Sequence, residues 1–420
     1  MSTPTNPATN VRTKRTVKDL DVYQRSASLS QLSKAAEAAS PPNYPPESRF
    51  SLSALWGWVR SYLSYVFRKK HYFPPYTASP TQALYDLLDE SNAAQAVRVS
   101  IAGDWGTGTV EAESVADSMM KFNPHFTIHI GDIYFVGDPP SVNENCRGIR
   151  NPNNNYDPVT WPIGTKGSFA LNGNHEMYAN GGGYFDVFLP ELGLVEADGK
   201  MSGQQTSFFC LQNKYWRIIA IDTGYNSMGV PILSHIPFIS EIPGIGGNCR
   251  LEDDLIKWIK TVVNPSQDQR GLIIISHHQN YSAFPKEDQY KKPAQQLWDA
   301  GIQRPVLWFW GHEHRLAGYD LYGTDDLKSY GRCIGHGGMP VDRGGPQQKP
   351  TPVFYDDRRA ENTYGVNGFL NLTFKGANLS ATYQDLDGTS VLQEEWTVNG
   401  SGAVQLLSRQ KLINDPDFHA

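Results

Sequence analysis

Val97-Arg-Val-Ser-Ile-Ala-Gly-Asp-Trp-Gly106 joins an apolar run to an acidic turn. The first part of this stretch is rich in β-branched residues, which predicts a buried strand over 97–103, and Asp104 follows directly. The same arrangement of an apolar run and a polar segment occurs four more times. These further segments are Gly131-Asp132, Gly173-Asn174-His175-Glu176, Ser276-His277-His278 and Gly311-His312-Glu313-His314. Because open α/β sheets bind ligands at the carboxyl ends of their strands, we expect the five segments to form one site.

The side chains of the five segments are of the kinds that bind transition metals. Asp, Asn and His supply oxygen and nitrogen donors that suit Zn, Mn or Fe. A single His would be a weak indication, because most histidines are ordinary core or surface residues. Five polar segments in order, each after a predicted strand, together indicate a dinuclear metal site.

The order and residue types of these segments resemble the calcineurin-like metallophosphoesterases, and most closely their purple-acid-phosphatase-like branch, whose first motif is GDxG. Further similarity lies in Gly173-Asn-His-Glu-Met-Tyr178, in Gly181-Gly-Gly-Tyr-Phe185 and in His278-Gln-Asn-Tyr-Ser-Ala283. The resemblance covers about residues 97 to 396. It implies an α/β fold with two facing mixed β-sheets flanked by helices, a four-layer αββα sandwich, here with an N-terminal helical extension.

The resemblance also implies two divalent or trivalent metal ions, Fe, Mn or Zn. The six expected ligands are Asp104, Asp132, Asn174, His277, His312 and His314. Asp132 would bridge both ions, since one carboxylate can give an oxygen to each. Asp104 and His314 would bind the first ion, and the other three residues the second. His277 rather than its neighbour His278 is expected to be the ligand.

His175 is the residue that the resemblance assigns to catalysis. It would protonate the leaving group or stabilise charge, and Glu176 or Asp104 would orient it. A metal-bound hydroxide would be the nucleophile, because two cations bring the pKa of bound water near neutrality. His278, His336 and Arg343 are candidate substrate contacts, although a loop salt bridge is the favoured explanation for Arg343.

The chain differs from the purple-acid-phosphatase-like branch at the position of one metal ligand. The branch has GDxxY, whose Tyr binds a ferric ion, whereas here the run is Gly131-Asp132-Ile133-Tyr134-Phe135. Phe135 therefore stands at the ligand position, and Tyr134, one residue early, is expected to point elsewhere. Water, or Tyr134 after a local distortion, would complete the first metal. Without the tyrosine we expect no purple colour.

Composition and charge limit the class of protein. The chain has 420 residues and a net charge of -6, which argues against a general nucleic-acid binder. Its four cysteines are widely spaced, which favours buried free thiols. There is no apolar signal core and no run of about 18 apolar residues, so we expect a cytoplasmic protein.

Four regions follow one another in the predicted organisation. Residues 1–50 are expected to be a mobile tail, 51–95 a helical extension, 96–400 the catalytic domain and 401–420 a C-terminal tail. In the extension, an apolar stripe predicts a helix over 51–70, which would pack on the domain, lie on a membrane surface or meet a partner chain. A second helix is predicted from Ser79-Pro80, with Leu84 and Leu87 on its apolar side.

Within the catalytic domain, the spacing of apolar residues and the positions of turn-forming residues predict the remaining helices and strands. Strands are expected at 97–103, 126–131, 168–172, 217–221, 271–276 and 305–310, and helices at about 110–122, 251–263 and 293–300. Residues 366–398 alternate as strands with turns at Lys375-Gly376 and Asp387-Gly388. The stretch 139–165 is expected to be a long surface loop. The predicted function is hydrolysis of a phosphomonoester or phosphodiester; the alternative is a binding or scaffold protein that keeps the fold without catalysis.

Overall fold

The computed structural model describes residues 14–17, 64–65, 68–87, 96–152, 156–228, 247–284, 289–323, 327–360 and 364–420. Most of the predicted tail over 1–50 and most of the predicted helix over 51–70 lie outside these residues. The other predicted elements can be compared with the structure.

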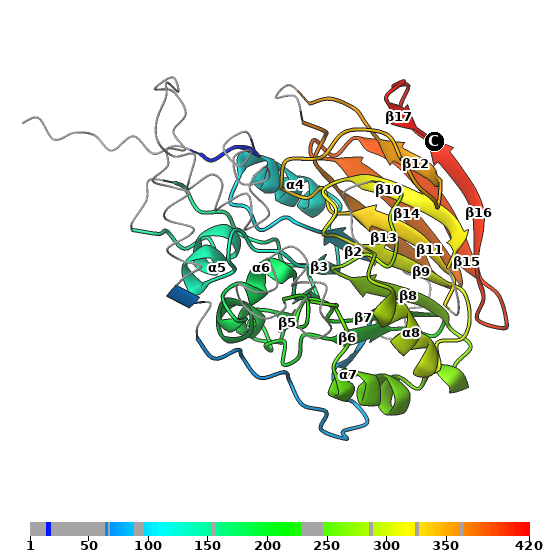
Figure 1. Ribbon diagram of the computed structural model, residues 1–420, viewed down its shortest axis with the longest axis horizontal. Coiled ribbons are helices and arrows are strands. Elements are labelled where there is room, and N and C mark those ends of the chain that lie inside the picture. The colour runs from blue at the N-terminus through cyan, green and yellow to red at the C-terminus, as the bar shows by residue number, and fades with distance from the viewer. Residues whose placement is uncertain are drawn as a thin grey trace, which may run out of the picture.

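Two mixed β-sheets form the centre of the molecule, which confirms that part of the predicted fold (Figure 1). The nine-stranded sheet has the order β1 (Leu84–Asp86), β6 (Phe209–Gln212), β7 (Trp216–Ala220), β8 (Gly271–Ser276), β9 (Val306–Trp310), β11 (Ser329–Ile334), β10 (Leu316–Tyr322), β12 (Pro352–Asp356) and β17 (Phe418–His419). The eight-stranded sheet has the order β16 (Val404–Lys411), β15 (Ser390–Val398), β14 (Asn378–Asp385), β13 (Gly368–Lys375), β2 (Val97–Ala102), β3 (Phe126–His129), β4 (Gly167–Ala170) and β5 (Gly193–Leu194). Strands β2, β3 and β4 are parallel neighbours in the second sheet, and β7, β8 and β9 are parallel neighbours in the first.

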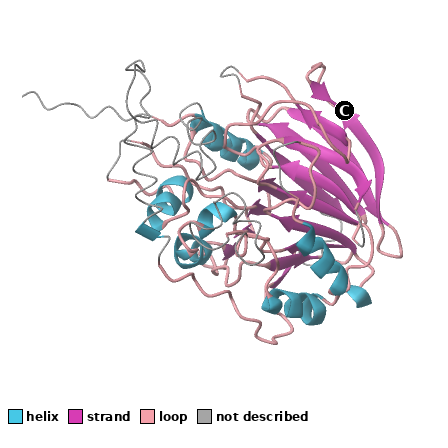
Figure 2. Ribbon diagram, in the orientation of Figure 1, coloured by secondary structure: helices cyan, strands magenta, loops and turns pink. Residues whose placement is uncertain are grey.

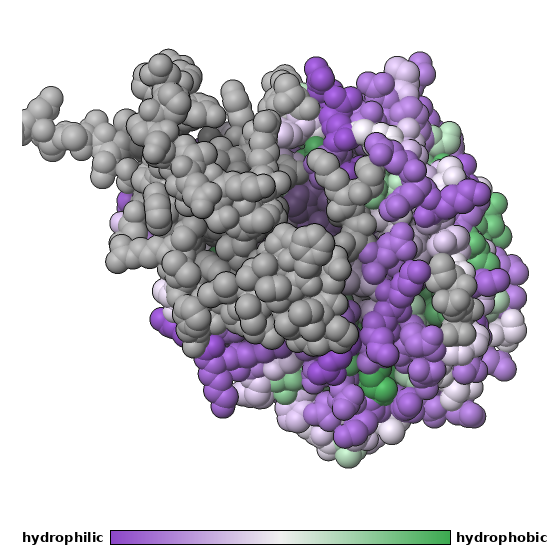
Figure 3. All heavy atoms as spheres, viewed as in Figure 1, coloured by the Kyte–Doolittle hydropathy of each residue, from purple (hydrophilic) through white to green (hydrophobic). Residues whose placement is uncertain are grey.

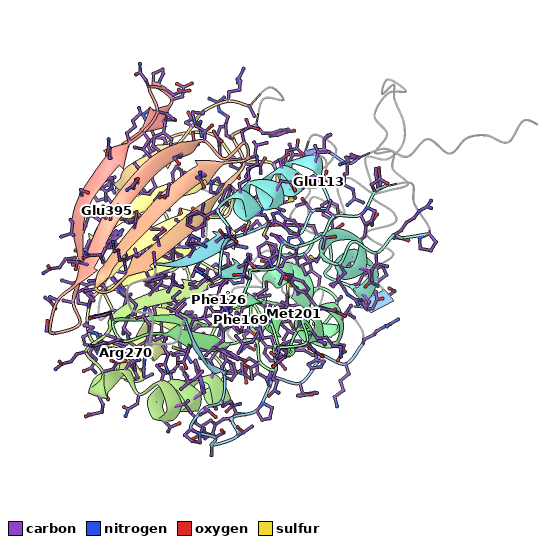
Figure 4. The ribbon with its side chains drawn as sticks, turned by 180° about the vertical axis from the view of Figure 1, so that it is seen from behind. Glu113, Phe126, Phe169, Met201, Arg270 and Glu395 are labelled. Carbon is purple, nitrogen blue, oxygen red and sulfur yellow. The ribbon has the colours of Figure 1, made fainter. Side chains whose placement is uncertain are left out.

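The two sheets pack face to face because alternate side chains of each strand point to opposite faces. In β8, Ile273 and Ile275 belong to the core between the sheets, whereas Leu272 and Ile274 belong to the core beneath the outer helices. Phe126 of β3 and the neighbouring Phe169, labelled in Figure 4, lie in the inter-sheet core with ring centroids 6.4 Å apart. Both faces of β8 are thus apolar, as expected for a strand covered on both sides.

Helices cover the outer faces (Figure 2). Helices α7 (Asp253–Trp258) and α8 (Lys291–Asp299) lie on the nine-stranded sheet, where Leu255, Trp258 and Leu297 are buried. Helix α4 (Val110–Lys121) and the one-turn π-helix η3 (Tyr184–Phe188) lie on the eight-stranded sheet. The order of layers is therefore helix, sheet, sheet, helix.

The prediction of a second helix from Ser79 is wrong. Ser79–Ala83 form turns, and the chain then enters β1, which pairs in parallel with β6 at the edge of the sheet. The Gln82 side chain receives the backbone N–H of Thr77 and donates to the carbonyl of Pro75, so it does not cap a helix. Pairing with a strand more than a hundred residues away has overridden a weak local preference.

The described part of the N-terminal extension packs on the domain. The Phe73 ring lies 5.8 Å from that of Phe208 and 5.0 Å from that of Tyr225. The indole N–H of Trp258 donates to the carbonyl of Gln82 at 2.7 Å. The chain after the predicted helix therefore packs on the domain, whereas the three alternatives for the helix over 51–70 fall mostly outside the described residues.

Two further predictions need correction. The expected surface loop over 139–165 contains helix α5 (Pro139–Cys146), which begins at Asp138, whose side chain accepts the backbone N–H of Ser141 at 3.0 Å. The expected C-terminal tail over 401–420 supplies β16 and β17, one to each sheet. The strands and turns expected in 366–398 are confirmed as β13, β14 and β15.

Residues 14–17, which fall in the expected mobile tail, pack against the start of α4. Val17 is 1% exposed, and Arg15 forms a parallel bridge with Thr109. The expected mobile tail therefore includes a short segment that packs on the domain.

Among the described helices, none has the length and apolar character needed to cross a membrane. The described surface in the view of Figure 3 is mostly hydrophilic, with apolar side chains in small separate groups. Cys146, Cys210, Cys249 and Cys333 are all buried and unpaired with one another, as predicted for free thiols.

Candidate metal centre

The five polar segments follow β2, β3, β4, β8 and β9 at their carboxyl ends. Three of the predicted ligands adopt left-handed backbone conformations, with φ of 56° at Asp104, 71° at Asp132 and 65° at His312. Such conformations are uncommon outside glycine and gather at functional sites. The turns bring their side chains to a common point between the two sheets. Gly173 allows the closest approach, because a Cβ there would lie 2.2 Å from Asp132 Oδ1.

Asp104, Tyr134 and His314 form one half of the centre. The Tyr134 hydroxyl lies 3.0 Å from Asp104 Oδ1, from Asp132 Oδ2 and from His314 Nε2. His314 Nε2 is 3.5 Å from Asp104 Oδ1. Asp104 and Tyr134 are 0% and 2% exposed. This half contains the two ligands predicted for the first metal and a phenol.

The position of Tyr134 corrects the expectation that it points elsewhere. That expectation rested on the position of Tyr134, one residue before the ligand position of the resembling branch. The backbone between β3 and Tyr134 is not regularly extended, since φ is 101° at Gly131 and 71° at Asp132, and the Tyr134 hydroxyl lies at the centre. Phe135, at the position where a tyrosine was expected, packs on Tyr134 instead and is part of a small apolar cluster with Met339.

Asp132, Asn174, His277 and His312 form the other half. His277 Nε2 lies 3.2 Å from Asp132 Oδ1 and 3.2 Å from Asn174 Oδ1. The Asn174 amide nitrogen donates to the Tyr178 hydroxyl at 3.2 Å, which leaves its oxygen directed at the site. The His312 and His277 rings are 5.2 Å apart.

Each nitrogen of His277 has a defined role. Its Nδ1 donates to the carbonyl of Ile130 at 2.9 Å, because that oxygen can only accept. Nε2 is therefore the atom that faces the centre, and a backbone carbonyl holds the ring as is usual for metal-binding histidines. Ligand atoms of Asp104, Asp132 and His277 all lie within 4.8 Å of one another, and so do those of His277, His278 and His312.

The charges of the centre are strongly coupled in the metal-free protein. Burial lowers the pKa of His277, but Asp132 outweighs it and raises the pKa to about 9. Burial favours the neutral form of Asp132, yet His277 and His175 hold its pKa well below the usual range. Burial, together with the charge of His277, lowers the pKa of His312 to about 3. A protonated His277 thus supplies positive charge between the carboxylates.

His175 lies beside this group rather than within it. Its Nδ1 donates to the carbonyl of Phe135 at 2.6 Å, and its Nε2 is 3.8 Å from Asp132 Oδ2. The side chain is 20% exposed, so Nε2 can reach a bound molecule. The Phe135 carbonyl orients the ring, and neither Glu176 nor Asp104, the two residues expected to do so, has a hydrogen bond to the His175 ring among the described contacts.

Glu176 instead holds two ligand loops together. One carboxylate oxygen accepts the backbone N–H of Gly173 at 3.0 Å and that of Asp132 at 3.3 Å. Burial, then the adjacent Asp132, raises the pKa of Glu176 to about 8. The residue is fully buried and acts through the backbone.

The three candidate substrate contacts have different surroundings. His278 is buried behind His312, with ring centroids 4.5 Å apart, and Thr223 Oγ1 lies 3.1 Å from its Nδ1. His336 is 2% exposed, and its Nε2 is 2.9 Å from the point where a Cβ of Gly368 would lie, so its ring faces β13. Arg343 donates twice to the carbonyl of Asp357, at 2.9 and 2.7 Å. Arg343 therefore makes the contact within its loop that was the alternative to a role in substrate binding.

Comparison with known proteins gives one family and several solved structures. The family model described as calcineurin-like phosphoesterase matches residues 97–316. No curated protein matches.

Similar solved structures include the purple acid phosphatase PPD1 from yellow lupin, at 14% identity and a TM-score of 0.47, covering 71% of this chain and 53% of the lupin chain. GAP50, described as the anchor in the inner membrane complex of Plasmodium, has 13% identity and a TM-score of 0.46. The match covers 72% of this chain and 89% of the GAP50 chain. A dimetal phosphatase from Danio rerio has 10% identity and a TM-score of 0.42. The match covers 72% of this chain and 99% of the Danio rerio chain. The match thus spans about half of the lupin chain, and identities this low say nothing about substrate.

Proposed function

The chain belongs to the calcineurin-like phosphoesterase family, and we propose that it hydrolyses a phosphoester at a dinuclear metal centre at the carboxyl ends of β2, β3, β4, β8 and β9. One observation carries the proposal. The donor atoms of Asp104, Asp132 and His277 converge within 4.8 Å although all three side chains are buried. Buried carboxylate and imidazole donors that converge in this way can hold a metal ion.

The donor set fits two metal ions. Asp104, Tyr134 and His314 would hold one ion, Asn174, His277 and His312 the other, and Asp132 would contact both. Carboxylate, amide and imidazole donors suit Zn, Mn or Fe, and a phenol is a further oxygen donor. When bound, such a pair of ions supplies Lewis-acid chemistry, acidifying water and neutralising the charge of phosphoryl oxygens.

His175 would act on the leaving group. The Phe135 carbonyl holds Nδ1–H, so Nε2 is the atom that gives or receives a proton. Burial lowers the pKa of the His175 ring, and Asp132, 3.8 Å from Nε2, only partly opposes that shift, so the protonated form that donates at Nε2 depends on Asp132. A positioned acid of this kind contributes about 10²–10⁴ in rate.

The proposal covers phosphomonoesters and phosphodiesters. Its test is turnover of a panel of chromogenic mono- and diesters by the full chain loaded with Zn²⁺, Mn²⁺ or Fe³⁺. We expect metal-dependent hydrolysis that a chelator abolishes, that His314→Ala removes, and that His419→Ala keeps, since His419 is an exposed residue of β17 stacked on Tyr355. A protein that binds metal but hydrolyses none of the esters with any metal would be a binding protein on this fold, and the proposal would be wrong.

A further inference from the structure

The loop that carries Asp104 is held from outside the centre by helix α5. Asn145 of α5 donates from one amide nitrogen to the carbonyl of Gly106 at 3.1 Å and to that of Tyr134 at 2.8 Å. The backbone N–H of Tyr134 in turn donates to the carbonyl of Gly106 at 2.9 Å. Asn145 is 1% exposed, so water cannot replace it. One side chain therefore ties the loop of Asp104 to the loop of Tyr134.

The contact between α5 and this loop is very close. Gly108 has a φ of 66°, and a Cβ there would lie 2.4 Å from Asn145 Oδ1. Glycine is the residue that adopts this conformation without strain and leaves this space. Gly108 thus leaves room for the Asn145 side chain, and the Asn145 side chain in turn holds the loop through the Gly106 carbonyl.

Arg15, far away in the sequence, holds the same loop beside Asn145: a Cβ at Gly108 would lie 3.4 Å from Arg15 Nη1. Its guanidinium donates to the carbonyl of Thr107 at 3.0 Å, and its own carbonyl accepts the backbone N–H of Val110 at 2.8 Å. The guanidinium lies 3.7 Å from Glu144 and 4.5 Å from the ring centre of Tyr156. It therefore joins the loop to α5, which also carries Asn145.

The flanking residues fix Arg15 at the start of α4. Val17 is buried, and its backbone N–H donates to Glu111 at 3.0 Å. Lys14 pairs with Glu113, which is labelled on α4 in Figure 4. The Lys14–Glu113 pair is partly exposed, and among the described contacts neither side chain hydrogen-bonds the loop 106–109, so the pair offers a matched control within the same segment.

We propose that Asn145 and Arg15 are positioning residues for the metal ion held by Asp104, Tyr134 and His314, an inference that rests on the proposed dinuclear centre. They act through the loop 106–109 and through the Tyr134 carbonyl, and neither touches the metal. Their loss frees Asp104 and Tyr134 to move relative to His314. Loss of partners that orient ligands typically costs 10–100-fold in metal affinity.

The test is competition of full-length variants with a chromophoric chelator for Zn²⁺, which resolves tight and weak sites. His314→Ala identifies the site of the first ion and Asn174→Ala the site of the second. We expect Asn145→Ala and Arg15→Ala each to weaken, by about 10–100-fold, the site that His314→Ala affects, and to leave the site that Asn174→Ala affects within about threefold. Arg15→Lys, which keeps one donor for Thr107, should recover part of the affinity.

Two control variants and a melt of the metal-free protein separate positioning from general damage. Lys14→Ala removes the exposed pair of the same segment, and Asn143→Ala changes a residue of α5 that accepts Arg147 at 2.7 Å and contacts no ligand loop. Both should bind Zn²⁺ as the wild type does. Asn145→Leu, which has a similar size and no donor, serves if the alanine variant does not fold.

Each outcome has one meaning. If both sites weaken equally, or if the Asn145 and Arg15 variants bind as tightly as the controls, the positioning role is refuted while the metal centre stands. If the wild type binds no Zn²⁺, the proposed function itself fails, which is a different result from unaltered binding in the variants.

Discussion

Tyr134→Phe removes one oxygen from the centre of the proposed site and little else. The hydroxyl lies 3.0 Å from Asp104, Asp132 and His314, whereas the ring contacts of Tyr134 with Phe135 and Met339 do not involve it. Burial and the two carboxylates raise the pKa of Tyr134 well above its ordinary value. In the metal-free protein the phenol is therefore protonated at neutral pH and donates to one of the carboxylates.

The expected loss of stability follows from that hydrogen bond. A buried hydrogen bond to a charged acceptor contributes about 1.5–3 kcal/mol. Metal-free Tyr134→Phe should unfold at lower urea concentration, with a free energy of unfolding reduced by about that amount. In the iron-loaded wild type, the phenol is placed to bind Fe³⁺ and give a visible charge-transfer band. The position of Tyr134 thus reverses the expectation of a colourless protein.

The assays are urea unfolding of metal-free protein, chelator competition and the visible spectrum of protein loaded with Fe³⁺. Tyr383→Phe is the matched control, because its hydroxyl also donates to a buried carboxylate, Glu394, at 3.0 Å, but between strands away from the ligand loops. The control should lose stability and keep metal affinity and colour. If the wild type is colourless with Fe³⁺ and Tyr134→Phe binds metal with unchanged affinity, the phenol is not a ligand and the reasoning is refuted.

Four other outcomes are expected. His175→Ala should keep both metal ions and lose about 10²–10⁴ in turnover, and loss of metal would show that it is a ligand. His314→Ala should lower metal content and turnover together, and full occupancy measured by elemental analysis would contradict its place in the centre. Arg332→Met should cost about 3–5 kcal/mol at pH 7, because Glu394, 2.8 Å away between the sheets, would stay buried without its main partner. Although burial favours the neutral acid, Arg332 lowers the pKa of Glu394, so the pair stabilises the fold above pH 4.5, the ordinary pKa, and this stability is lost as the pH falls further. In the variant only Arg409, 2.8 Å from Glu394, still acts in this direction, so urea unfolding should show a smaller loss of stability on acidification. Phe73→Ala should reduce stability by about 1–3 kcal/mol, less than for a fully buried Phe because its side chain is half-buried, and an unchanged melt would mean that the extension does not support the domain.

The strands and the convergence of the candidate ligands were predictable because both signals are local. A run such as Gly271–Ser276 is apolar on both faces, and the polar residues that follow it stand at a strand end whatever the rest of the chain does. The structure places the donor atoms of Asp104, Asp132 and His277 together as the five segments implied. The pairing of the strands then decides which segments meet.

The features that escaped prediction depend on backbone conformation or on distant partners. Tyr134 reaches the centre because Gly131 and Asp132 have positive φ, which no residue pattern after β3 specifies. Helix α5 is short and carries few apolar residues, so its periodicity is weak, and its end is fixed by contacts of Asn145 with two loops. The strand at 84–86 exists only because β6 offers an edge to pair with.

Metal stoichiometry of the purified full-length chain tests the dinuclear centre most directly. Metal-free protein is loaded with Zn²⁺ or Fe³⁺, freed of excess ion and analysed for bound metal per chain, with Asn174→Ala, His314→Ala and the exposed-histidine variant His419→Ala treated in parallel. The account predicts close to two ions per chain for the wild type and for His419→Ala, and fewer for the two ligand variants. A wild-type chain that retains no ion, or ligand variants that retain as many ions as the wild type, would contradict it.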